Sequence, residues 1–292
     1  MKIIILSRNP SLYSTESLYK AAYRRNHQIS VIDHMHCDVY IETGNPHIMY
    51  LGKKIENADA IIPRIGYTAT FHGAAIIRQF ESMGVFTTLG SQPLLNARDK
   101  LSCLQILSAN GLSVPKTIVS DNYDSIASVV DQIEQYPVII KLLNGTHGLG
   151  VILAENRSNA ESILEAFYSA RQKVMIQEYI GESQGSDLRA FIVDGKIAGA
   201  MKRHAAPGEF RSNLHRGATA VPYRLTDIEM KVAIRAVKIL GLKIAGVDLL
   251  QSRRGPLILE VNASPGLEGI ESVTGKDIAG RIIQFIEDKK RR

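Results

Sequence analysis

The sequence predicts a mixed α/β protein built from three successive units. In the first hundred of its 292 residues, short apolar runs alternate with segments of helical period, which is typical of a parallel sheet covered by helices. The rest of the chain contains pairs of apolar runs joined by short polar turns, which indicates antiparallel hairpins. Changes in this pattern divide the chain into expected domains at 1–99, 100–186 and 187–292.

The first unit is expected to begin with a buried strand at 2–6, a continuous apolar run. A helix at 14–26, strands at 29–33 and 60–63 and a helix at 71–83 follow. The loop at 7–10 contains no glycine, so it cannot be the glycine-rich fingerprint that binds dinucleotides. This absence argues against a dehydrogenase.

The second unit is expected to begin with a helix at 101–110, because Gly111 is a natural helix end. The third unit should open with a hairpin whose turn is Asp194-Gly195, a strong two-residue turn signal. The remaining expected elements are strands at 138–143, 151–154 and 174–178, a helix at 159–168, hairpin strands at 188–193 and 196–202, a helix at 226–240, hairpin strands at 244–250 and 257–262, and a helix at 277–290.

The composition favours an acidic partner and a reducing compartment. The formal net charge is +6, which suits phosphates or carboxylate-rich substrates. The chain has no tryptophan and no alternating basic and aromatic stripe, so direct nucleic-acid binding is not expected. Two cysteines imply no disulfide framework, and no segment resembles a signal peptide or membrane span. We therefore expect a cytoplasmic protein that does not engage membranes.

The last hairpin carries the most informative residues. Alternation along a strand places Glu260 and Asn262 on one face and the apolar Leu259 on the other. A turn at 253–255 then brings Asp248 roughly opposite Glu260. Two carboxylates and one amide oxygen are hard ligands that suit Mg²⁺ or Mn²⁺ better than zinc. The alternative is a hairpin with solvated acids on its exposed face.

A lysine followed by glycines marks a candidate phosphate loop. Lys141 lies at the end of a strand, and Gly145, Gly148 and Gly150 follow within ten residues. Glycine lets backbone amides approach an anion closely, so such loops bind phosphates. The lysine precedes the glycines, which excludes the P-loop pattern. A glycine-rich hairpin turn is the alternative interpretation.

Further polar groups follow on neighbouring strands and loops. Glu178 ends a strand at a unit boundary, where it or its neighbours could meet a purine, although a strand running into a loop is the plainer interpretation. Asp187 and Arg189 share one face of the next strand. The loop at 210–217, with Arg203 upstream, concentrates guanidinium groups that suit carboxylate and phosphate oxygens.

The segment at 33–38, Asp-His-Met-His-Cys-Asp, invites a transition-metal interpretation. No second ligand cluster with zinc-like spacing accompanies it, so a structural zinc site is not expected. The sequence also lacks a Gly-x-Ser-x-Gly nucleophile elbow, which argues against a serine hydrolase.

Taken in order, the lysine strand, glycine loop, Gln-Glu-Tyr, Asp-Leu-Arg, basic loop, Gly-Val-Asp and Glu-Val-Asn closely resemble the ATP-grasp ligases. Within that superfamily the chain is similar to the RimK-type α-L-glutamate ligases, which modify a ribosomal protein. The resemblance covers nearly the whole chain. Its most specific stretches are 210–217 and Asn-Ala-Ser-Pro-Gly-Leu-Glu-Gly at 262–269.

The resemblance implies an ATP-grasp fold, in which an N-terminal α/β domain precedes two subdomains that hold ATP between their sheets. It implies that ATP contacts Lys100, Lys141, Gly145, Gly148, Gly150, Glu178, Tyr179, Asp187, Arg211, Ser212 and Asn213. Two Mg²⁺ or Mn²⁺ ions would be held by Asp248, Glu260 and Asn262. Electrostatic stabilisation of the reaction is expected from Arg189, Arg203 and Arg211. His147 departs from the family pattern, where glutamine is expected.

The implied reaction joins L-glutamate to the C-terminal carboxylate of a small-subunit ribosomal protein through an acylphosphate made with ATP. In such chemistry the protein contributes mainly positioning and charge neutralisation. One alternative is an ATP-grasp ligase that makes poly-α-glutamate or uses a small-molecule acceptor. A remote alternative is a ribosome- or RNA-binding protein with an ATP switch, although the metal triad argues against it. The resemblance also implies a homotetramer.

Overall fold

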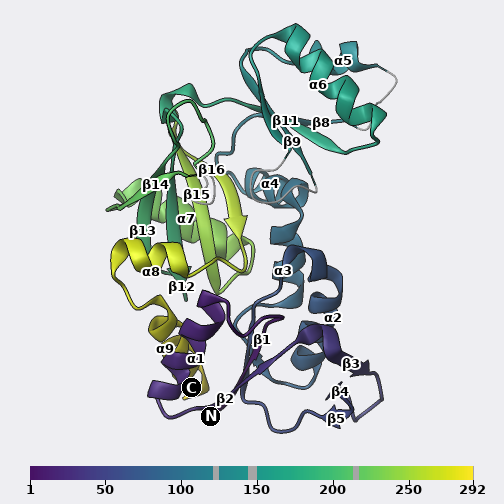
Figure 1. Cartoon of the computed structure of the whole chain (residues 1–292), viewed down its shortest axis with the longest axis vertical. Coiled ribbons are helices and arrows are strands. Elements are labelled where there is room, and N and C mark those ends of the chain that lie inside the picture. The colour runs from purple at the N-terminus through teal and green to yellow at the C-terminus, as the bar shows by residue number, and fades with distance from the viewer. Residues whose placement is uncertain (121–124, 144–149, 213–216, 292) are drawn as a thin grey trace.

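The computed structural model describes residues 1–120, 125–143, 150–212 and 217–291. Three sheet-based units follow one another along the long axis of an elongated molecule (Figure 1). The N-terminal sheet lies at one end, the antiparallel sheet of the C-terminal part lies in the middle, and the central sheet lies at the other end. The mixed α/β class predicted from the sequence is confirmed.

The N-terminal unit is built on a parallel sheet, as its alternation of strands and helices predicts. The strand order is β2-β1-β6-β7, and every pair in it is parallel. The expected strands and helices lie within two residues of their predicted positions. The elements are β1 (Lys2–Leu6), α1 (Tyr13–Arg24), β2 (Gln28–Ile32), β6 (Ala60–Pro63), α2 (Thr70–Ser82) and β7 (Phe86–Thr87).

A small antiparallel sheet between β2 and β6 has no counterpart in the predicted elements. It contains β3 (Cys37–Tyr40), β4 (His47–Tyr50) and β5 (Lys53–Lys54). These strands are short and half-polar, so their sequences carry little period-2 signal. The preceding segment is a 3₁₀ turn at His34–His36. The Asp33 carboxylate caps its N-terminus by accepting a hydrogen bond from the Met35 amide.

The central unit is an antiparallel sheet in the order β10-β9-β11-β8. Two helices cover it, and the apolar core lies between them and the sheet. Two further helices connect this unit to the first one. The elements are α3 (Ser91–Arg98), α4 (Lys100–Ala109), β8 (Thr117–Val119), α5 (Ile126–Val130), β9 (Val138–Leu142), β10 (Val151–Ala154), α6 (Arg157–Ser169) and β11 (Val174–Glu178).

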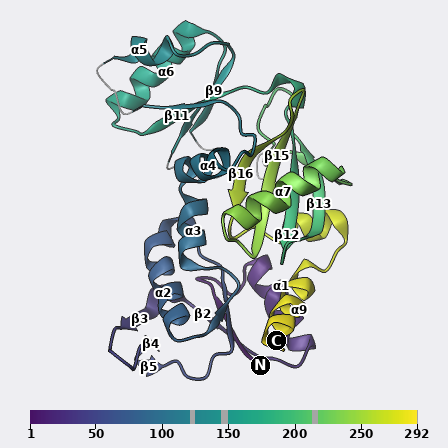
Figure 2. The same cartoon turned by 180° about the vertical axis from the view of Figure 1, so that it is seen from behind.

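The C-terminal sheet is antiparallel, in the order β14-β13-β12-β15-β16. Helix α7 covers one face (Figure 2), and its N-terminus has a capping box between Thr226 and Glu229. None of the described helices combines the length and the apolar character that a membrane crossing requires. The elements are β12 (Ser186–Val193), β13 (Lys196–His204), β14 (Thr219–Pro222), α7 (Asp227–Ile239), β15 (Ile244–Ser252), β16 (Gly255–Asn262) and α8 (Glu268–Thr274).

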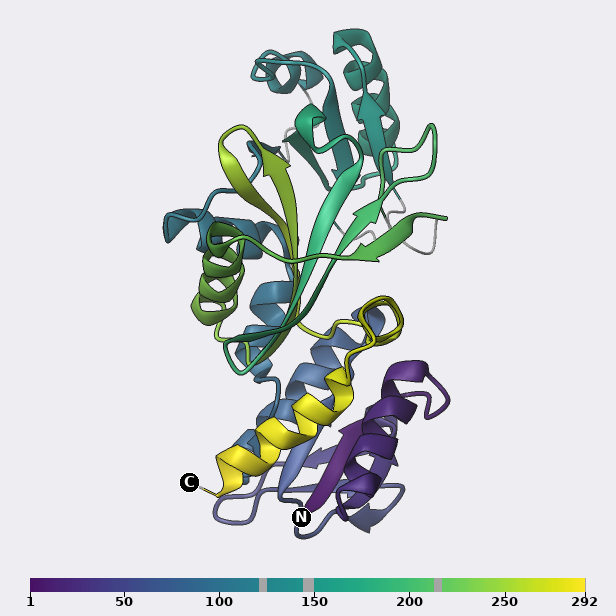
Figure 3. The same cartoon turned by 90° about the vertical axis from the view of Figure 1, so that its left-hand side faces the viewer.

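The last helix, α9 (Ile278–Lys290), returns to the N-terminal unit and packs beside α1 (Figure 3). Its apolar side shares a core with Ile3 of β1 and Phe191 of β12. An ion pair also joins the two parts. Glu287 Oε1 accepts a hydrogen bond from Arg25 Nε at 2.9 Å and lies 2.7 Å from His27 Nε2. Helix α9 therefore joins the first and last parts of the chain.

We expect Glu287→Gln to lower the unfolding temperature by about 2 °C near neutral pH, because a bidentate pair of this kind contributes about 1 kcal/mol. The hydrogen bond from Arg25, opposed by burial, holds the pKa of Glu287 at about 2, below its ordinary 4.5. Its contribution is therefore complete above pH 4.5 and is lost as the pH falls towards 2. Thermal unfolding at several pH values should show the two proteins converging across that window.

Glu16→Gln is the matched control, because Glu16 pairs with Lys20 on the exposed surface of α1. It should leave the unfolding temperature unchanged within error. An effect of Glu287→Gln that stays constant from neutral pH into the acid range would contradict the assigned ion pair.

Candidate active site

A cavity of about 940 Å³ lies between the central and C-terminal sheets and extends to the N-terminal unit. This volume is at the upper end of the range for small-molecule sites. Gly145, Gly148 and Asn213, as well as the divergent His147, lie outside the described residues. The predicted site residues that line the cavity are Lys100, Lys141, Glu178, Tyr179, Asp187, Arg189, Arg203, Arg211, Ser212, Asp248, Glu260 and Asn262.

Gly150 is the one described site residue that is not part of the cavity wall. Its φ of +66° is in the left-handed region, and an added Cβ would lie 2.4 Å from Leu142 Cδ1. The return of the chain into β10 therefore requires glycine here on conformational grounds. The predicted ATP contact of Gly150 stays a prediction.

The hairpin of β15 and β16, called here the candidate metal hairpin, pairs Asp248 with Glu260 as predicted. Its turn is shorter than the expected 253–255, because Gly255 already pairs with Ser252. A β-bulge follows at once, because Leu249 pairs with Ile258 and leaves Leu259 as the extra residue. The bulge turns Leu259 towards the cavity, whereas Ile258 is in the core. The expectation that Leu259 lies on the apolar face is therefore wrong, since strict alternation does not continue through a bulge.

Two arginines and two aspartates form a buried ion cluster on the cavity side of the C-terminal sheet. Arg203 donates to Asp187 through Nε at 2.6 Å and through Nη2 at 2.5 Å. Its Nη2 is also 2.9 Å from Asp248 Oδ2. Arg189 forms a second fork with Asp248, donating from Nε to Oδ1 and from Nη2 to Oδ2 at 2.6 Å. The cluster is neutral overall.

The cluster keeps Asp248 ionised in a buried place. Burial alone would raise its pKa, but the charges of Arg189 and Arg203 outweigh burial and lower it. Asp187 has one arginine and is repelled by Asp248, so burial prevails and its pKa is raised. Among the described residues, the contacts from Arg189 and Arg203 occupy three of about four lone-pair sites of the Asp248 carboxylate. Capacity for a cation thus remains, so the donor set fits a hard divalent ion.

Two lysines provide positive charge across the cavity from this hairpin. Lys100, at the start of α4, donates from Nζ to the Leu142 carbonyl at 3.2 Å. Burial lowers the pKa of Lys141 to about 8, the neighbouring Lys100 charge acts in the same direction, and Glu260 opposes both. Burial likewise lowers the pKa of Lys100. Two desolvated ammonium groups near one carboxylate form a site for a further anion.

The basic loop is held against the edge of the central sheet. Arg211 donates from Nε to Glu209 Oε1 at 2.9 Å, from Nη2 to Glu209 Oε2 at 2.6 Å, and from Nη1 to the Val151 carbonyl at 3.3 Å. The hydrogen bond from Arg211 lowers the pKa of Glu209 to about 2, against a smaller effect of burial. The Ser212 hydroxyl reaches Asp187. This loop therefore spans from the central sheet to the ion cluster.

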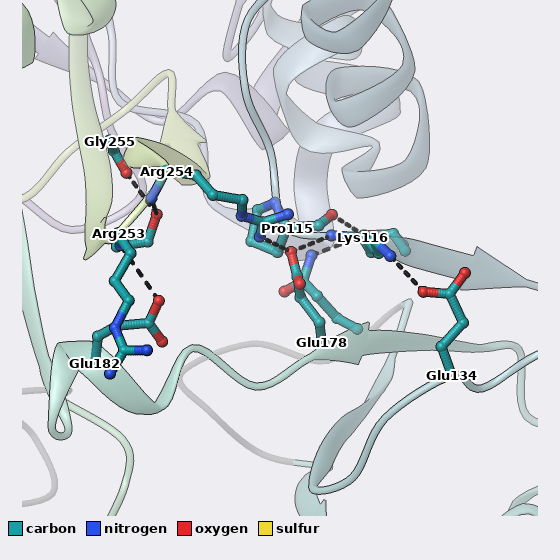
Figure 4. A network of polar contacts seen from close by, with 11 residues as sticks. Pro115, Lys116, Glu134, Glu178, Glu182, Arg253, Arg254 and Gly255 are labelled. Carbon is teal, nitrogen blue, oxygen red and sulfur yellow. Dashed lines mark hydrogen bonds and ion pairs between the residues drawn. The ribbon is translucent and has the colours of Figure 1, made fainter.

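The carboxylate of Glu178 connects two units (Figure 4). Its Oε1 accepts from the Lys116 amide at 2.7 Å and from the Arg254 guanidinium at the turn between β15 and β16. Beside it, the Arg253 amide donates to Glu182 Oε1 at 3.3 Å. Both donors to Glu178 bind the same oxygen, Oε1, and the purine contact expected from Glu178 and Tyr179 stays a prediction.

The cavity also contains two arginines that the predicted site did not include. Arg64 directly follows β6, and its Nη2 donates to the Pro265 carbonyl at 2.8 Å. Arg98, at the end of α3, donates to the Ile65 carbonyl. A sequence signal for Arg64 existed, because ligands collect at the carboxyl ends of parallel strands. Arg98 offered no comparable signal.

Comparisons with known proteins agree with this geometry. A family model described as the RimK-like ATP-grasp domain matches residues 97–286, and one described as the RimK pre-ATP-grasp domain matches residues 1–94. A protein of Vibrio cholerae named probable alpha-L-glutamate ligase is 52% identical over 287 residues, which cover 98% of this chain and 95% of the relative. Probable alpha-L-glutamate ligase 1 of Hahella chejuensis is 52% identical over 289 residues, covering 99% and 95%.

Solved structures share the fold at low sequence identity. The ATP-grasp ligase PsnB, complexed with a precursor variant, Mg and ADP, has a TM-score of 0.75 at 18% identity, covering 99% of this chain and 98% of PsnB. A RimK domain ATP-grasp protein from Sphaerobacter thermophilus has a TM-score of 0.71 at 20% identity, covering 98% and 99%. The chain therefore belongs to the RimK-like ATP-grasp family, and the predicted ATP-grasp fold and ligase class are confirmed.

We expect Arg203→Gln to lower the free energy of unfolding by about 3 to 5 kcal/mol, because it leaves two buried carboxylates facing each other without their shared cation. Urea unfolding followed by circular dichroism measures this cost. Arg254→Gln is the control, since it breaks a half-exposed pair and should cost less than about 1 kcal/mol. Equal costs for the two variants would contradict the assigned burial of the cluster.

Proposed function

We propose that this member of the RimK-like ATP-grasp family ligates L-glutamate to the C-terminal carboxylate of a small-subunit ribosomal protein, with ATP as the energy source. One observation carries the proposal: a carboxylate pair suited to divalent ions and a pair of desolvated lysines face the same cavity. Relatives at 52% identity that bear the name of probable alpha-L-glutamate ligases support the choice of glutamate.

We propose that ATP lies between the central and C-terminal sheets. Lys100 and Lys141 are assigned to its phosphates, because an anion there would offset their desolvation. Backbone groups of 178–179 are assigned to the purine, and Asp187 to the ribose side. The basic loop, including Arg211 and Ser212, would approach the nucleotide from the C-terminal side. The expected domains, 1–99, 100–186 and 187–292, are proposed as the structural units around this site.

Asp248, Glu260 and Asn262 are the residues proposed to hold two Mg²⁺ or Mn²⁺ ions. All three line the cavity, and Asn262 pairs with Gly246, two residues before Asp248 on the neighbouring strand. A bound divalent ion supplies charge neutralisation for the phosphates during transfer. Arg189 and Arg203 are proposed to orient Asp248 and to add positive potential beside it.

The chemistry follows from the poor electrophilicity of a carboxylate. The acceptor carboxylate attacks the γ-phosphorus of ATP, the bond to the ADP oxygen breaks, and an acylphosphate forms. The amine of glutamate then attacks the carbonyl carbon, and inorganic phosphate and a proton leave as the amide bond forms. The residues around the cavity position the groups and balance their charge, and no protein nucleophile is required.

Two alternatives differ in the acceptor or in the class of function. A ligase that makes poly-α-glutamate or extends a small-molecule acceptor would use the same cavity, because the ATP and metal residues do not choose the acceptor. A ribosome- or RNA-binding protein with an ATP switch has no need for paired metal carboxylates. A cytoplasmic location, expected from the composition, and a homotetramer, implied by the resemblance, complete the proposal.

Intact-mass spectrometry tests the reaction directly. The purified protein is incubated with ATP, Mg²⁺, glutamate and the sixth protein of the small ribosomal subunit, and parallel samples omit ATP or the acceptor. We expect additions of glutamyl residues to the acceptor that require ATP. Free glutamate oligomers beside an unmodified acceptor would support the first alternative, and ATP-independent binding to ribosomes without any ligation would support the second.

We expect Glu260→Gln to reduce ligation by about a hundredfold or more while the fold is retained, because an amide replaces a charged metal ligand. Glu165→Gln on the exposed side of α6 is the control and should keep full activity. Turnover is measured from ADP and ligated product, and folding from thermal unfolding. Undiminished turnover in the Glu260 variant would remove Glu260 from the metal site.

A further inference from the structure

The cavity continues beyond the candidate metal hairpin to an end formed by the N-terminal unit. This end is lined by Arg64 and Arg98 together with residues of the loop that follows β16. The candidate metal ligand Glu260 is near enough to act on Arg98, whereas the candidate purine residues belong to the central unit. The ATP and metal assignments leave this end without a ligand, although it contains two cationic side chains.

The two guanidinium groups are close enough to influence each other. Burial lowers the pKa of Arg64 to about 10, and the positive charge of Arg98 acts in the same direction. Arg98 donates to the carbonyl of Ile65, the residue next to Arg64, so its side chain reaches across to the segment that follows β6. Two like charges held side by side in a half-buried place repel each other unless an anion joins them.

The described residues provide only weak compensation for these charges. Within 1–120, 125–143, 150–212 and 217–291, neither arginine forms an ion pair, and the hydrogen bonds that they donate go to backbone carbonyls. The Nε atom of Arg98 is buried and has no hydrogen-bond partner there. Burial lowers the pKa of Arg98 and the charge of Glu260 only partly opposes this, and the proposed metal ions would engage that same carboxylate.

From this arrangement we infer that Arg64 and Arg98 form the binding site for the two carboxylates of the incoming L-glutamate, an inference that rests on the proposed ligase function. Two planar guanidinium forks match two carboxylates in number and in geometry. The amine of the bound amino acid would then face the metal hairpin, where the acyl group is activated. A glutamine or an alanine would leave one guanidinium without its anion.

We assign this end to the free amino acid and not to the protein acceptor. A protein C-terminus needs an open path through which its chain leaves the site, whereas a free amino acid can be surrounded. Arg64 is tied to the Pro265 carbonyl, and the Arg98 Nε atom is shielded from solvent. In this assignment the acceptor approaches from another part of the cavity, and Arg64 and Arg98 determine which amino acid is added.

The test measures steady-state ligation by the full-length protein and by Arg98→Gln, Arg98→Lys and Arg64→Lys, varying glutamate, ATP and acceptor in turn. Glutarate, which has both carboxylates of glutamate but no amine, serves as a competitive probe. Arg78→Gln, an exposed change on α2, is the matched control. Thermal unfolding of each variant, with and without ATP, shows that the fold and the nucleotide site persist.

We expect Arg98→Gln to raise the KM for glutamate and the inhibition constant of glutarate together, by a factor of about 10 to 100, while the KM for ATP changes little. Arg98→Lys and Arg64→Lys should show smaller increases, because they keep the charge and lose the fork. The Arg78 control should match the parent protein.

Two results would overturn the assignment while the proposed function stands. Unchanged glutamate KM in all three variants would show that the pair has no role in substrate binding. An increase confined to the KM of the acceptor would assign the pair to the protein substrate. If the parent protein forms no glutamate ligation product at all, the proposed function fails, and this inference fails with it.

Discussion

Two β-bulges in the C-terminal sheet determine which side chains meet at the candidate active site. A regular hairpin closed at Asp194-Gly195 would set Asp187 opposite Lys202, but the bulge between Phe191 and Ile192 sets it opposite Arg203. The second hairpin behaves in the same way, since its bulge sets Asp248 opposite Glu260, where regular pairing would give Leu259. One extra residue in each strand pair thus changes the partner of an aspartate. Asp187 faces the guanidinium of Arg203 and not the ammonium of Lys202, and Asp248 faces the carboxylate of Glu260 and not the side chain of Leu259.

The ion cluster that these bulges create contributes little to the stability of the fold, so we expect its role to lie in the cavity. Burying four charged groups gains little stability over apolar packing, since desolvation offsets most of the attraction. What the cluster provides is a fixed orientation, because Arg189 and Arg203 hold Asp248 from two sides and keep it ionised. A carboxylate fixed before a cation or phosphate arrives needs no reorganisation when charge shifts in the cavity, and this is the condition for electrostatic catalysis.

The sequence predicted the elements better than the contacts between them. Periodicity located the parallel sheet, the hairpins and α9, since this signal is local. The expected three-residue turn at 253–255 gave the correct pairing of Asp248 with Glu260, which the structure reaches through a two-residue turn and a bulge. The ion cluster was beyond such reasoning, because Asp187 and Arg189 meet partners chosen by a bulge and by the pairing of β12 with the distant β15. The strands β3 to β5 were missed because they are too short to show a period. Arg64 and Arg98 reach the cavity only through packing of the N-terminal unit against the loop after β16.

That packing brings the N-terminal unit to the wall of the cavity. Helix α9 is bound to the N-terminal unit through the ion pair of Glu287 with Arg25. Arg64 bonds to Pro265, in the segment between β16 and α8. The N-terminal unit therefore contacts the last part of the chain at two places, before α8 and in α9. The central sheet, in contrast, meets the C-terminal hairpin through exposed contacts such as Glu178 with Arg254. Exposed ion pairs contribute less stability than buried packing, so the central sheet is attached less firmly than the N-terminal unit. We therefore expect the central sheet to move when a nucleotide binds. The arginine end of the cavity and the metal hairpin would then stay in register while the nucleotide side opens and closes.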